Sequence, residues 1–301
     1  MASRIGVDLG GSWLRVGAID THANALVGEV TKYPTPRDWQ SLVDLLARHN
    51  APDVEGFGVA ISGPIENHTT VINGPNLPWL NGRNAGRDLQ AALGKGVVIA
   101  NDMEAATEGE MAHGVLKAYR WAIFDTISTG WGGNLILNGV RVDGEPGHAN
   151  VTFDSPLRCG AGHIGCYEAL YSGSALERQI AAAAGDNADR TPADRWESFN
   201  QHVEAGAPWA IQLLNGWAEG VGRAWANVLN RIRAMQAIVY MGTTAENLLA
   251  IPRVQQRVRA TIKQIAMYPE HQSPEFPILK AQEEHRAIFG AVIVYEKQRR
   301  A

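Results

Sequence analysis

A short run of β-branched residues that passes directly into a helix-forming segment constrains the fold of this chain most strongly. Residues 97–100 (Val-Val-Ile-Ala) are typical of a buried strand, and residues 103–108, which are rich in Ala and Glu, are typical of a helix. Asn101 and Asp102 therefore fall on a strand-to-helix junction, where N-capping favours both residue types. A helix cap is one interpretation of this pair, and a general base at Asp102 is the other.

The segments around this junction predict one α/β unit. Gly10-Gly11-Ser12 joins two alternating segments into a β-hairpin, and Pro34 and Pro36 end the sheet pattern that follows. Strands are expected at 4–9, 13–20, about 26–31 and 56–61, and helices at 37–49 and 85–93. Together with the strand that ends at Asn101, the order is three strands, a helix, a strand, a helix and a strand.

The same pattern begins again in the second half of the chain. A strand at 121–127, a glycine turn at 128–133 and a returning strand at 135–137 resemble the first hairpin, which indicates a duplicated domain. Helices are expected at 174–184, 192–204, 207–232 and about 283–297, with a strand at 237–241. We expect a small α/β domain over 1–112, with the C-terminal helix (about 283–301) packing back on it, and a large α/β domain over 113–282.

Composition argues against several classes of protein. The chain has 301 residues, 45% of them hydrophobic, and a formal net charge of -4 without a run of Lys or Arg, so a basic nucleic-acid surface is not expected. No apolar stretch approaches the roughly 20 residues of a membrane helix. The first strand begins almost at once, so we expect no signal peptide, and two cysteines make no disulfide framework. We expect a cytoplasmic protein that binds neither nucleic acid nor membranes.

Two glycine-rich turns are candidates for phosphate binding, because backbone N–H groups in such turns form concave anion sites. The candidate residues are Gly10, Gly11 and Ser12 in the first turn, and Thr129, Gly130, Gly132 and Gly133 in the second. Neither turn fits the P-loop or Rossmann pattern, and tight hairpins also use glycine for backbone reasons alone. Asp8 ends the first strand and could either reach Mg²⁺ through water or accept N–H bonds from the turn.

The densest group of possible ligands lies between residues 144 and 168. His148, Cys159 and Cys166 could hold zinc, although a structural site usually has four protein ligands. The alternative is two buried, reduced cysteines and a surface histidine. Glu145 and Glu168 flank this group, and their carboxylates could be solvated or could bind sugar hydroxyls.

In this order, the motifs resemble those of the ROK (repressor, open reading frame, kinase) sugar kinases over essentially the whole chain. They are Asp8-Leu9-Gly10-Gly11-Ser12, Asn101-Asp102, Ser128-Thr129-Gly130, Gly144-Glu145-Pro146-Gly147-His148 and Gly165-Cys166-Tyr167-Glu168, followed by Ser172-Gly173. The resemblance implies an α/β, two-domain, actin-like (ribonuclease H-like) ATPase fold with a cleft between the domains. It also implies ATP and Mg²⁺ as cofactors, a small-molecule sugar as substrate, and a homodimer or higher homo-oligomer.

The resemblance also implies roles for individual residues. Asp102 would deprotonate the sugar hydroxyl. The sugar would contact Gly63, Asn76, Asn101, Asp102, Glu145, His148 and Glu168. The nucleotide would contact Asp8, Gly10, Gly11, Ser12, Thr129, Gly130, Gly132 and Gly242. A structural zinc ion would be held by His148, Cys159 and Cys166.

The chain departs from the family pattern at a few positions. Ala161 stands where the family has a third zinc-binding cysteine, so zinc would be weakened, absent, or completed by His163 or water. Ser128 and Asn134 stand where glycine is usual, and Met241-Gly242-Thr243 replaces a glycine triplet. These changes could shift the grip on the nucleotide or the preferred phosphoryl donor.

The implied reaction is of the glucokinase type, in which sugar and ATP give sugar 6-phosphate and ADP. Glucose is the first candidate, and an N-acetylhexosamine, fructose or another sugar is the alternative. An aspartate with an ordinary pKa near 4 would be ionised at pH 7. A ROK repressor would need a helix-turn-helix before the first phosphate motif, and we expect no room for it in the seven residues before Asp8. A non-catalytic sugar-binding homologue is the third interpretation, against which Asp102 and both turns argue.

Overall fold

The computed structural model describes residues 2–20, 22–74, 76–185, 191–282 and 284–300. The chain forms two compact units. Unit 1 comprises Met1–Ala118 and Gln282–Ala301, and unit 2 comprises Tyr119–Ala281. None of the described helices combines the length and the apolar character that crossing a membrane requires.

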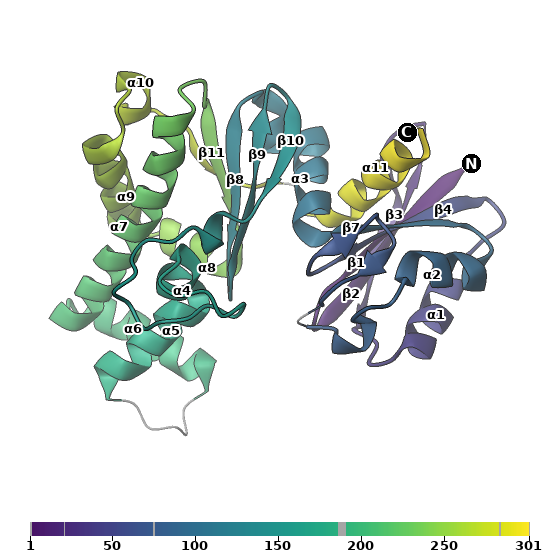
Figure 1. Ribbon diagram of the computed structural model, residues 1–301, viewed down its shortest axis with the longest axis horizontal. Coiled ribbons are helices and arrows are strands. Elements are labelled where there is room, and N and C mark those ends of the chain that lie inside the picture. The colour runs from purple at the N-terminus through teal and green to yellow at the C-terminus, as the bar shows by residue number, and fades with distance from the viewer. Residues whose placement is uncertain (1, 21, 75, 186–190, 283, 301) are drawn as a thin grey trace. The chain divides into compact units, whose positions relative to one another are not determined.

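Unit 1 is built on a five-stranded sheet in the order β3-β2-β1-β4-β7 (Figure 1). The strands are β1 (Ser3–Leu9), β2 (Trp13–Asp20), β3 (Ala25–Pro34), β4 (Val54–Ile61) and β7 (Gly96–Asn101). The predicted hairpin is confirmed, because β1 pairs antiparallel with β2, which pairs antiparallel with β3. The strands β1, β4 and β7 run parallel, and a separate pair, β5 (Ile65–Glu66) with β6 (Thr70–Val71), lies in the connection after β4.

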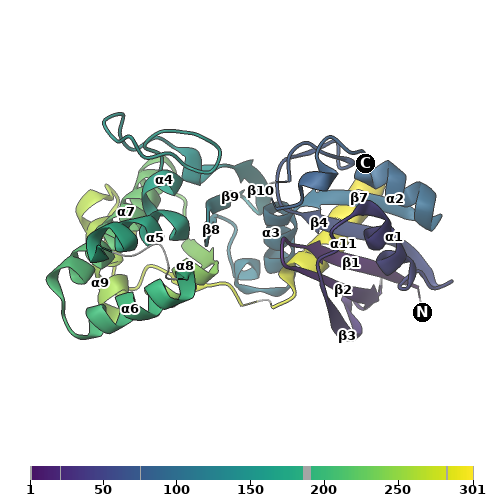
Figure 2. The same cartoon turned by 90° about the horizontal axis from the view of Figure 1, so that it is seen from below.

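Helices cover both faces of the sheet of unit 1 (Figures 1 and 2). The helices α1 (Trp39–Ala47) and α2 (Ala85–Leu93) pack on the face that carries the bulky side chains of β1 and β4, with Leu42, Leu46 and Leu89 in the same core. The helices α3 (Asp102–His113) and α11 (Arg286–Arg300) lie side by side on the other face. Two 3₁₀ turns, η1 (Pro78–Leu80) and η2 (Val115–Ala118), complete the unit.

Glycines let α11 approach both the sheet and α3 closely. A Cβ atom at Gly58 of β4 would overlap the carbonyl group of Ala291, and one at Gly290 of α11 would overlap the carbonyl group of Ala105 in α3. The face of the sheet that receives α11 is therefore flat, whereas the opposite face carries Val7, Phe57 and Val59.

Unit 2 repeats the sheet of unit 1 in the order β10-β9-β8-β11-β12. Its strands are β8 (Ala122–Ile127), β9 (Trp131–Leu137), β10 (Val140–Gly144), β11 (Ala237–Met241) and β12 (Ile278–Lys280). The first three again pair antiparallel, and β8, β11 and β12 run parallel. The two sheets share strand order and direction, so the interpretation as a duplicated domain is confirmed.

The start of β9 differs from the prediction. The strand β9 begins at Trp131 rather than at residue 135, so Gly132 and Gly133 belong to the strand and not to the turn. Gly133 lies opposite Asp125, and a Cβ atom at Gly133 would overlap the Asp125 carboxylate. The glycine is thus needed for close packing between neighbouring strands, and the turn itself is limited to residues 128–130.

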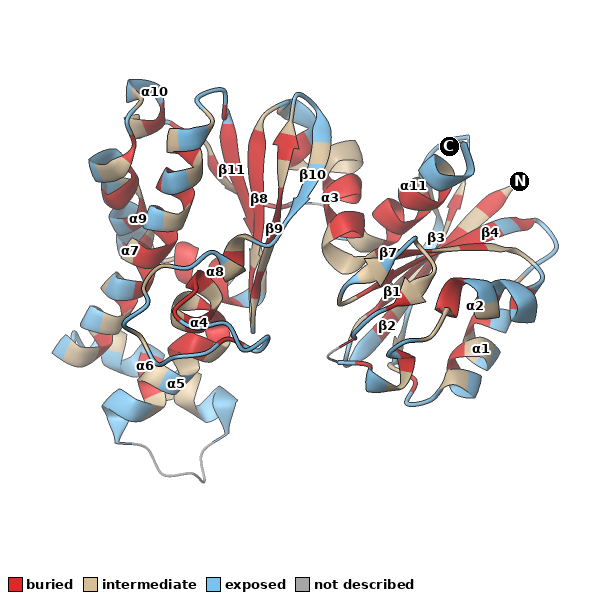
Figure 3. Ribbon diagram, viewed as in Figure 1, coloured by how far each residue is buried: buried red, intermediate tan, exposed pale blue. Residues whose placement is uncertain are grey.

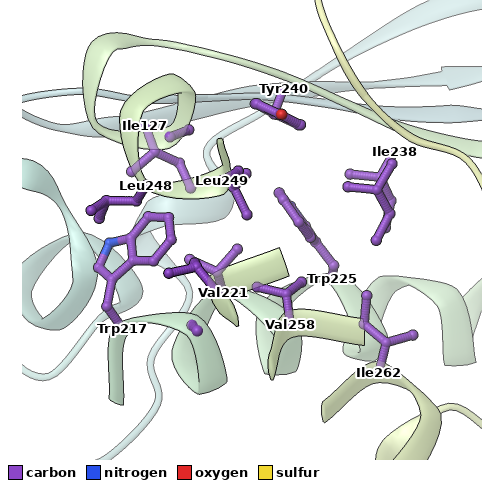
Figure 4. Packing of buried hydrophobic residues seen from close by; sticks show 14 of the residues in the cluster. Ile127, Trp217, Val221, Trp225, Ile238, Tyr240, Leu248, Leu249, Val258 and Ile262 are labelled. Carbon is purple, nitrogen blue, oxygen red and sulfur yellow. The ribbon is translucent and has the colours of Figure 1, made fainter. Parts of the chain in front are cut away.

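The core of unit 2 lies between its sheet and a group of helices. These helices are α4 (Tyr167–Tyr171), α5 (Gly173–Ala184), α6 (Pro192–Glu204), α7 (Pro208–Arg231), α8 (Thr243–Leu249), α9 (Pro252–Ile265) and α10 (Pro269–Gln272), with a 3₁₀ turn η3 (Pro146–His148). Figure 4 shows Trp225 of α7 between Ile238 and Tyr240 of β11 and Val258 and Ile262 of α9, and Trp217 of α7 belongs to the same core. Figure 3 shows β8 and β11 buried along most of their length, whereas β10 at the edge is largely exposed.

Asp125 is the buried carboxylate of this core. Its Oδ2 atom accepts hydrogen bonds from the indole Nε1 atoms of Trp131 (3.1 Å) and Trp225 (2.9 Å). Burial raises the pKa of Asp125 to about 6, and the two indole hydrogen bonds oppose that shift. Asp125 thereby fixes one tryptophan of the sheet and one of α7 in the same core.

Candidate active site

Predicted polar residues of unit 1 meet at the carboxyl edge of its parallel strands. Since β1, β4 and β7 run in the same direction, the residues after Leu9, Ile61 and Asn101 lie at one edge of the sheet. Ligands of open α/β sheets bind at this edge. It carries Asp8, the first glycine turn, Ser62-Gly63 and Asn101-Asp102.

Asn101 caps α3, as the helix-cap interpretation predicts. Its Oδ1 atom accepts hydrogen bonds from the backbone N–H groups of Met103 (2.8 Å) and Glu104 (3.3 Å). Its Nδ2 atom donates to the carbonyl oxygen of Gly63 at 2.8 Å, which ties the end of β7 to the segment after β4. Gly63 has a φ of 111°, a backbone conformation that glycine adopts without strain.

Asp102 is the first residue of α3 and is partly exposed. Its Oδ1 atom accepts the N–H group of Met103 at 2.9 Å. Burial raises the pKa of Asp102 to about 6, the negative charge of Asp8 adds to the rise, and hydrogen bonds from Met103 and Ser62 oppose it. The expectation of an ordinary pKa near 4 is therefore wrong, although a pKa of about 6 still leaves about nine-tenths of the carboxyl ionised at pH 7.

Ser62 was not among the predicted site residues. It lies directly after β4, and its side chain is near enough to the Asp102 carboxylate to oppose the rise in the pKa of that group. The signal that points to it is positional, because Ser62 follows the strand that pairs in parallel with β7. Neighbouring parallel strands bring the residues after their carboxyl ends together.

The first glycine turn presents backbone donors to solvent. The N–H group of Gly10 donates to the Trp13 carbonyl at 3.0 Å and closes the hairpin, and Thr35 Oγ1 donates to the Gly10 carbonyl at 2.6 Å. The N–H groups of Gly11 and Ser12 have no protein acceptor within the described part of the chain, and both residues are exposed. Asn76 lies beside this turn, because a Cβ atom at Gly11 would be 2.8 Å from the Asn76 Cβ atom. Pro75 of the predicted 73–79 sugar loop lies outside the described residues.

Asp8 makes an ion pair across the hairpin. Its Oδ2 atom accepts Nη1 of Arg15 at 2.9 Å, and the two residues are register partners in β1 and β2. The predicted alternative, in which Asp8 accepts N–H bonds from the turn, is thus not the arrangement found. Burial raises the pKa of Asp8, and the nearby guanidinium groups of Arg15 and Arg286 oppose that shift.

The second turn, at residues 128–130, lies at the carboxyl edge of the sheet of unit 2. The Ser128 N–H group donates to the Gly130 carbonyl at 2.9 Å, and the Ser128 hydroxyl lies 2.9 Å from the Thr243 hydroxyl. The N–H groups of Thr129 and Gly130 have no protein acceptor among the residues that the structure describes. Gly242 packs against this turn, because a Cβ atom there would be 2.6 Å from the Ile127 carbonyl oxygen.

Glu168 adjoins the same turn. Its Oε2 atom accepts the N–H group of Trp131 at 3.0 Å, and the same oxygen would be 2.8 Å from a Cβ atom at Gly130. Glu145 is exposed and precedes η3, where its carbonyl oxygen accepts the N–H group of His148 at 3.0 Å. The predicted nucleotide residue Gly130 and the predicted sugar residue Glu168 are therefore neighbours within unit 2.

The three predicted zinc ligands are brought together. The potential ligand atoms of His148, Cys159 and Cys166 all lie within 4.8 Å of one another. Both cysteines are buried and free, and Cys159 Sγ is 3.7 Å from Nδ1 of His148. A sulfur- and nitrogen-rich group of this size fits a zinc ion by its chemistry.

Known proteins similar to this chain belong to the family that its motifs resemble. The protein-family description "ROK family" matches residues 4–298. The glucokinase of Streptomyces coelicolor is 31% identical over 280 residues, which cover 85% of this chain and 87% of that protein. An N-acetylgalactosamine kinase from a Shewanella species is 29% identical over 244 residues, which cover 74% of this chain and 76% of its own.

Solved structures agree with these relatives. The ROK hexokinase from Thermus thermophilus superposes with a TM-score of 0.83 at 25% identity, with 99% of this chain and 100% of that chain covered. A ROK family glucokinase from Streptomyces griseus, solved in complex with glucose and AMPPNP, has a TM-score of 0.74 at 26% identity, with 98% and 99% covered. The chain has the fold of these kinases, and it belongs to the ROK family.

Proposed function

We propose that this chain is an ATP-dependent sugar kinase that converts a hexose and ATP into the sugar 6-phosphate and ADP. The observation that carries the proposal is Asp102, a partly exposed carboxylate with a pKa of about 6 at the carboxyl edge of the sheet of unit 1. A group with a pKa near the working pH is a better general base than an ordinary aspartate. The similarity to the Streptomyces coelicolor glucokinase supports the same activity.

Asp102 acts as the general base for the attacking hydroxyl group. Phosphoryl transfer depends mainly on positioning and charge stabilisation, so the base needs to accept the proton late, as the new O–P bond forms. The hydrogen bond from the Met103 N–H group holds the Asp102 carboxylate in place for this transfer. Asn101 fixes the start of α3 and hence the position of Asp102.

The two glycine turns bind the phosphates of the nucleotide. The N–H groups of Gly11 and Ser12 in the first turn, and of Thr129 and Gly130 in the second, are free to donate to phosphate oxygens. Asp8, Gly10 and Gly242 support these turns from the neighbouring strand ends. The partly exposed Asp8 carboxylate suits an outer contact to Mg²⁺, which when bound would neutralise phosphate charge.

The sugar is recognised by hydrogen bonds from Gly63, Asn76, Asn101, Asp102, Glu145, His148 and Glu168. We propose glucose as the first substrate to test, since the Streptomyces coelicolor glucokinase is 31% identical to this chain. An N-acetylhexosamine is the alternative, which the Shewanella relative supports.

The proposal also covers zinc, the oligomeric state and the cellular compartment. Zinc held by His148, Cys159 and Cys166 would fix the loop before α4 and so position His148 and Glu168. The two units correspond to the two domains of the kinase, and the family resemblance supports a homodimer. Because its phosphoryl donor is ATP, the cytoplasm is the compartment that we propose.

A coupled assay of ADP release over a panel of sugars tests the activity. The panel contains glucose, mannose, fructose, N-acetylglucosamine and N-acetylmannosamine, with ATP and Mg²⁺. We expect ADP release that depends on at least one sugar and exceeds the rate without sugar. Release that no sugar stimulates would contradict the kinase and favour a non-catalytic sugar-binding protein.

A further inference from the structure

The turn that contains Cys159 also contains a second histidine, His163. This residue lies beside the proposed zinc ligands His148, Cys159 and Cys166. The Cys159 N–H group donates to the His163 carbonyl at 3.0 Å, and the Gly162 N–H group donates to the Cys159 carbonyl at 3.0 Å. Arg158 and Ile164 form a bridge just outside this turn, and Gly162 has a φ of 88°. Residues 159 and 163 are therefore opposite each other across a tight turn, with their side chains adjacent.

The side-chain distances have the size of the edges of a zinc tetrahedron. Cys159 Sγ lies 3.6 Å from Nδ1 of His163 and 3.7 Å from Nδ1 of His148. Tetrahedral zinc with Zn–S of about 2.3 Å and Zn–N of about 2.0–2.1 Å gives sulfur-to-nitrogen edges of about 3.6 Å. Both edges match this value. The ligand atoms that all lie within 4.8 Å of one another are those of His148, Cys159 and Cys166, so His163 has to turn further toward these residues to complete the tetrahedron.

Two histidine rings and one thiol meet in an arrangement that a zinc ion can hold. Two imidazole Nδ1 atoms approach one sulfur atom, and the two rings stand edge to face with centroids 4.6 Å apart. Hydrogen bonds can also join these atoms, since the thiol can donate its proton to one nitrogen and accept an N–H group from the other. A zinc ion binds the sulfur and both nitrogen atoms at once.

We propose that His163 is the fourth protein ligand of this site, which is then a Cys₂His₂ zinc site formed by His148, Cys159, His163 and Cys166. The inference deepens the proposed function, since it rests on the zinc site proposed there. Ala161, where the family has a cysteine, is exposed and lies within the same turn, so His163 supplies the ligand that Ala161 cannot. A neutral imidazole in place of a thiolate also leaves the loaded site without net charge.

Zinc affinity is the quantity that tests this role. The metal-free chain is titrated with zinc in competition with a chromophoric chelator, for the wild type, His163→Ala and the double variant His163→Ala/Ala161→Cys. We expect one zinc per chain in the wild type and a loss of about 100-fold or more in His163→Ala, since even partners outside the coordination shell are worth 10–100-fold. The double variant should recover most of the affinity. His202→Ala, which removes an exposed histidine of α6, should change nothing.

Cobalt substitution gives a second readout that does not depend on activity. The Co²⁺-loaded wild type should show the intense d–d absorption of a four-coordinate site, and His163→Ala should change the position and intensity of these bands. Thermal melting of each variant with and without zinc shows whether it is folded. If His163→Ala does not fold, His163→Cys, which keeps a ligand at this position, should fold and bind zinc.

The outcomes separate the inference from the proposals on which it rests. Zinc in the wild type with unchanged affinity and cobalt spectrum in His163→Ala would overturn the role of His163 and leave the three-residue site standing. A wild type that binds no zinc would overturn both. Sugar-dependent ADP release is measured separately, so failure of the kinase proposal has its own signature.

Discussion

At the scale of single residues, Asp102 differs in its pKa from an ordinary aspartate. Its pKa of about 6 comes mainly from burial and places its titration within the range of ordinary assays. Protonation removes the proposed base, so kcat/KM should fall as the pH drops through about 6 rather than about 4. At pH 5 about one-tenth of the carboxyl is ionised, and we expect kcat/KM about tenfold below its plateau.

A pH profile of kcat/KM for the sugar, from pH 5 to 8, checks this expectation. The Asp102→Asn variant is the control, because its residual activity should lack this acid limb. A wild-type profile that stays flat down to pH 5 would show that Asp102 is not the group whose ionisation limits the rate.

The first glycine turn carries a second prediction at this scale. Gly10→Val should raise the KM for ATP by about tenfold or more, equivalent to about 1.4 kcal/mol of binding, because a Cβ atom there would be 3.2 Å from the Trp13 carbonyl oxygen and would distort the turn that presents the N–H groups of Gly11 and Ser12. The KM for the sugar should change much less. Steady-state kinetics with each substrate varied in turn measures both values. A rise confined to the sugar KM would show that the first turn has been misassigned.

At the scale of helices and strands, the close approach of α3 and α11 depends on glycine. Gly290→Ala should lower the free energy of unfolding by about 3 kcal/mol, because the added methyl group would overlap the Ala105 carbonyl of α3. Gly216→Ala is the matched control, since it also lies inside a helix but has open space around its Cβ position. That change should stabilise by up to about 1 kcal/mol. Urea unfolding of both variants compares them, and equal stability would contradict the packing.

Glu110 of α3 holds the two segments through which the chain leaves and re-enters unit 1. Its fully buried carboxylate accepts the N–H groups of Val115 (2.8 Å) and Gln282 (3.0 Å) and the Nε atom of Arg286 (3.3 Å). Glu110→Ala should cost about 3–5 kcal/mol, the usual loss when one partner of a buried ion pair is removed. Glu219→Ala, which breaks an exposed pair with Arg257, should cost less than about 1 kcal/mol. Urea unfolding midpoints test the difference, and similar losses for both variants would argue against the buried role of Glu110.

The sequence predicted best the elements whose ends carry a local signal. The predicted helices at 85–93 and 192–204 coincide with α2 and α6, whose N-caps Asn84 and Thr191 accept backbone N–H groups through their side chains, and the strand at 237–241 coincides with β11. The final helix extends to Arg300 rather than 297, and its predicted first residue, Glu283, lies outside the described residues.

The elements that the sequence did not predict are short, exposed or highly charged. The strand β12 has three residues, and β10 is an exposed edge strand. The helix α9 buries Val254, Val258 and Ile262 at helical spacing, but the charged residues between them hide this pattern. Gly132 and Gly133 predicted a turn, whereas the packing of Asp125 requires glycine inside the strand.

The sequence predicted some features of the candidate site and not others. Asn101 and Asp102 follow from a strand that ends on a capping residue, which is a local pattern. The position of Ser62 near Asp102 and the pKa of Asp102 depend on the parallel pairing of β4 with β7 and on burial, which no local pattern contains. The contact between Cys159 and His163 is partly predictable. The sequence shows that the two residues are four positions apart, but it does not show the turn that brings their side chains together.

At the scale of the whole molecule, the repeated sheet accounts for the positions of the two glycine turns. Each turn follows the first strand of a five-stranded sheet with the same order and the same directions. Each also presents two backbone N–H groups that have no protein acceptor in the described segments. The two units differ in the residues of the candidate site that each supplies, which are Asp102 in unit 1 and Glu168 with His148, Cys159 and Cys166 in unit 2.

Sugar-dependent ADP release by the wild type and by Asp102→Asn, measured beside sugar binding by titration calorimetry, tests the central claim most directly. The substitution keeps the size of the side chain and removes its ability to accept the proton. We expect kcat to fall by about 10²–10⁴, the usual contribution of a general base, while the Kd for the sugar stays the same. Full activity in Asp102→Asn would contradict the assignment of Asp102 as the base and with it the mechanism proposed for this kinase.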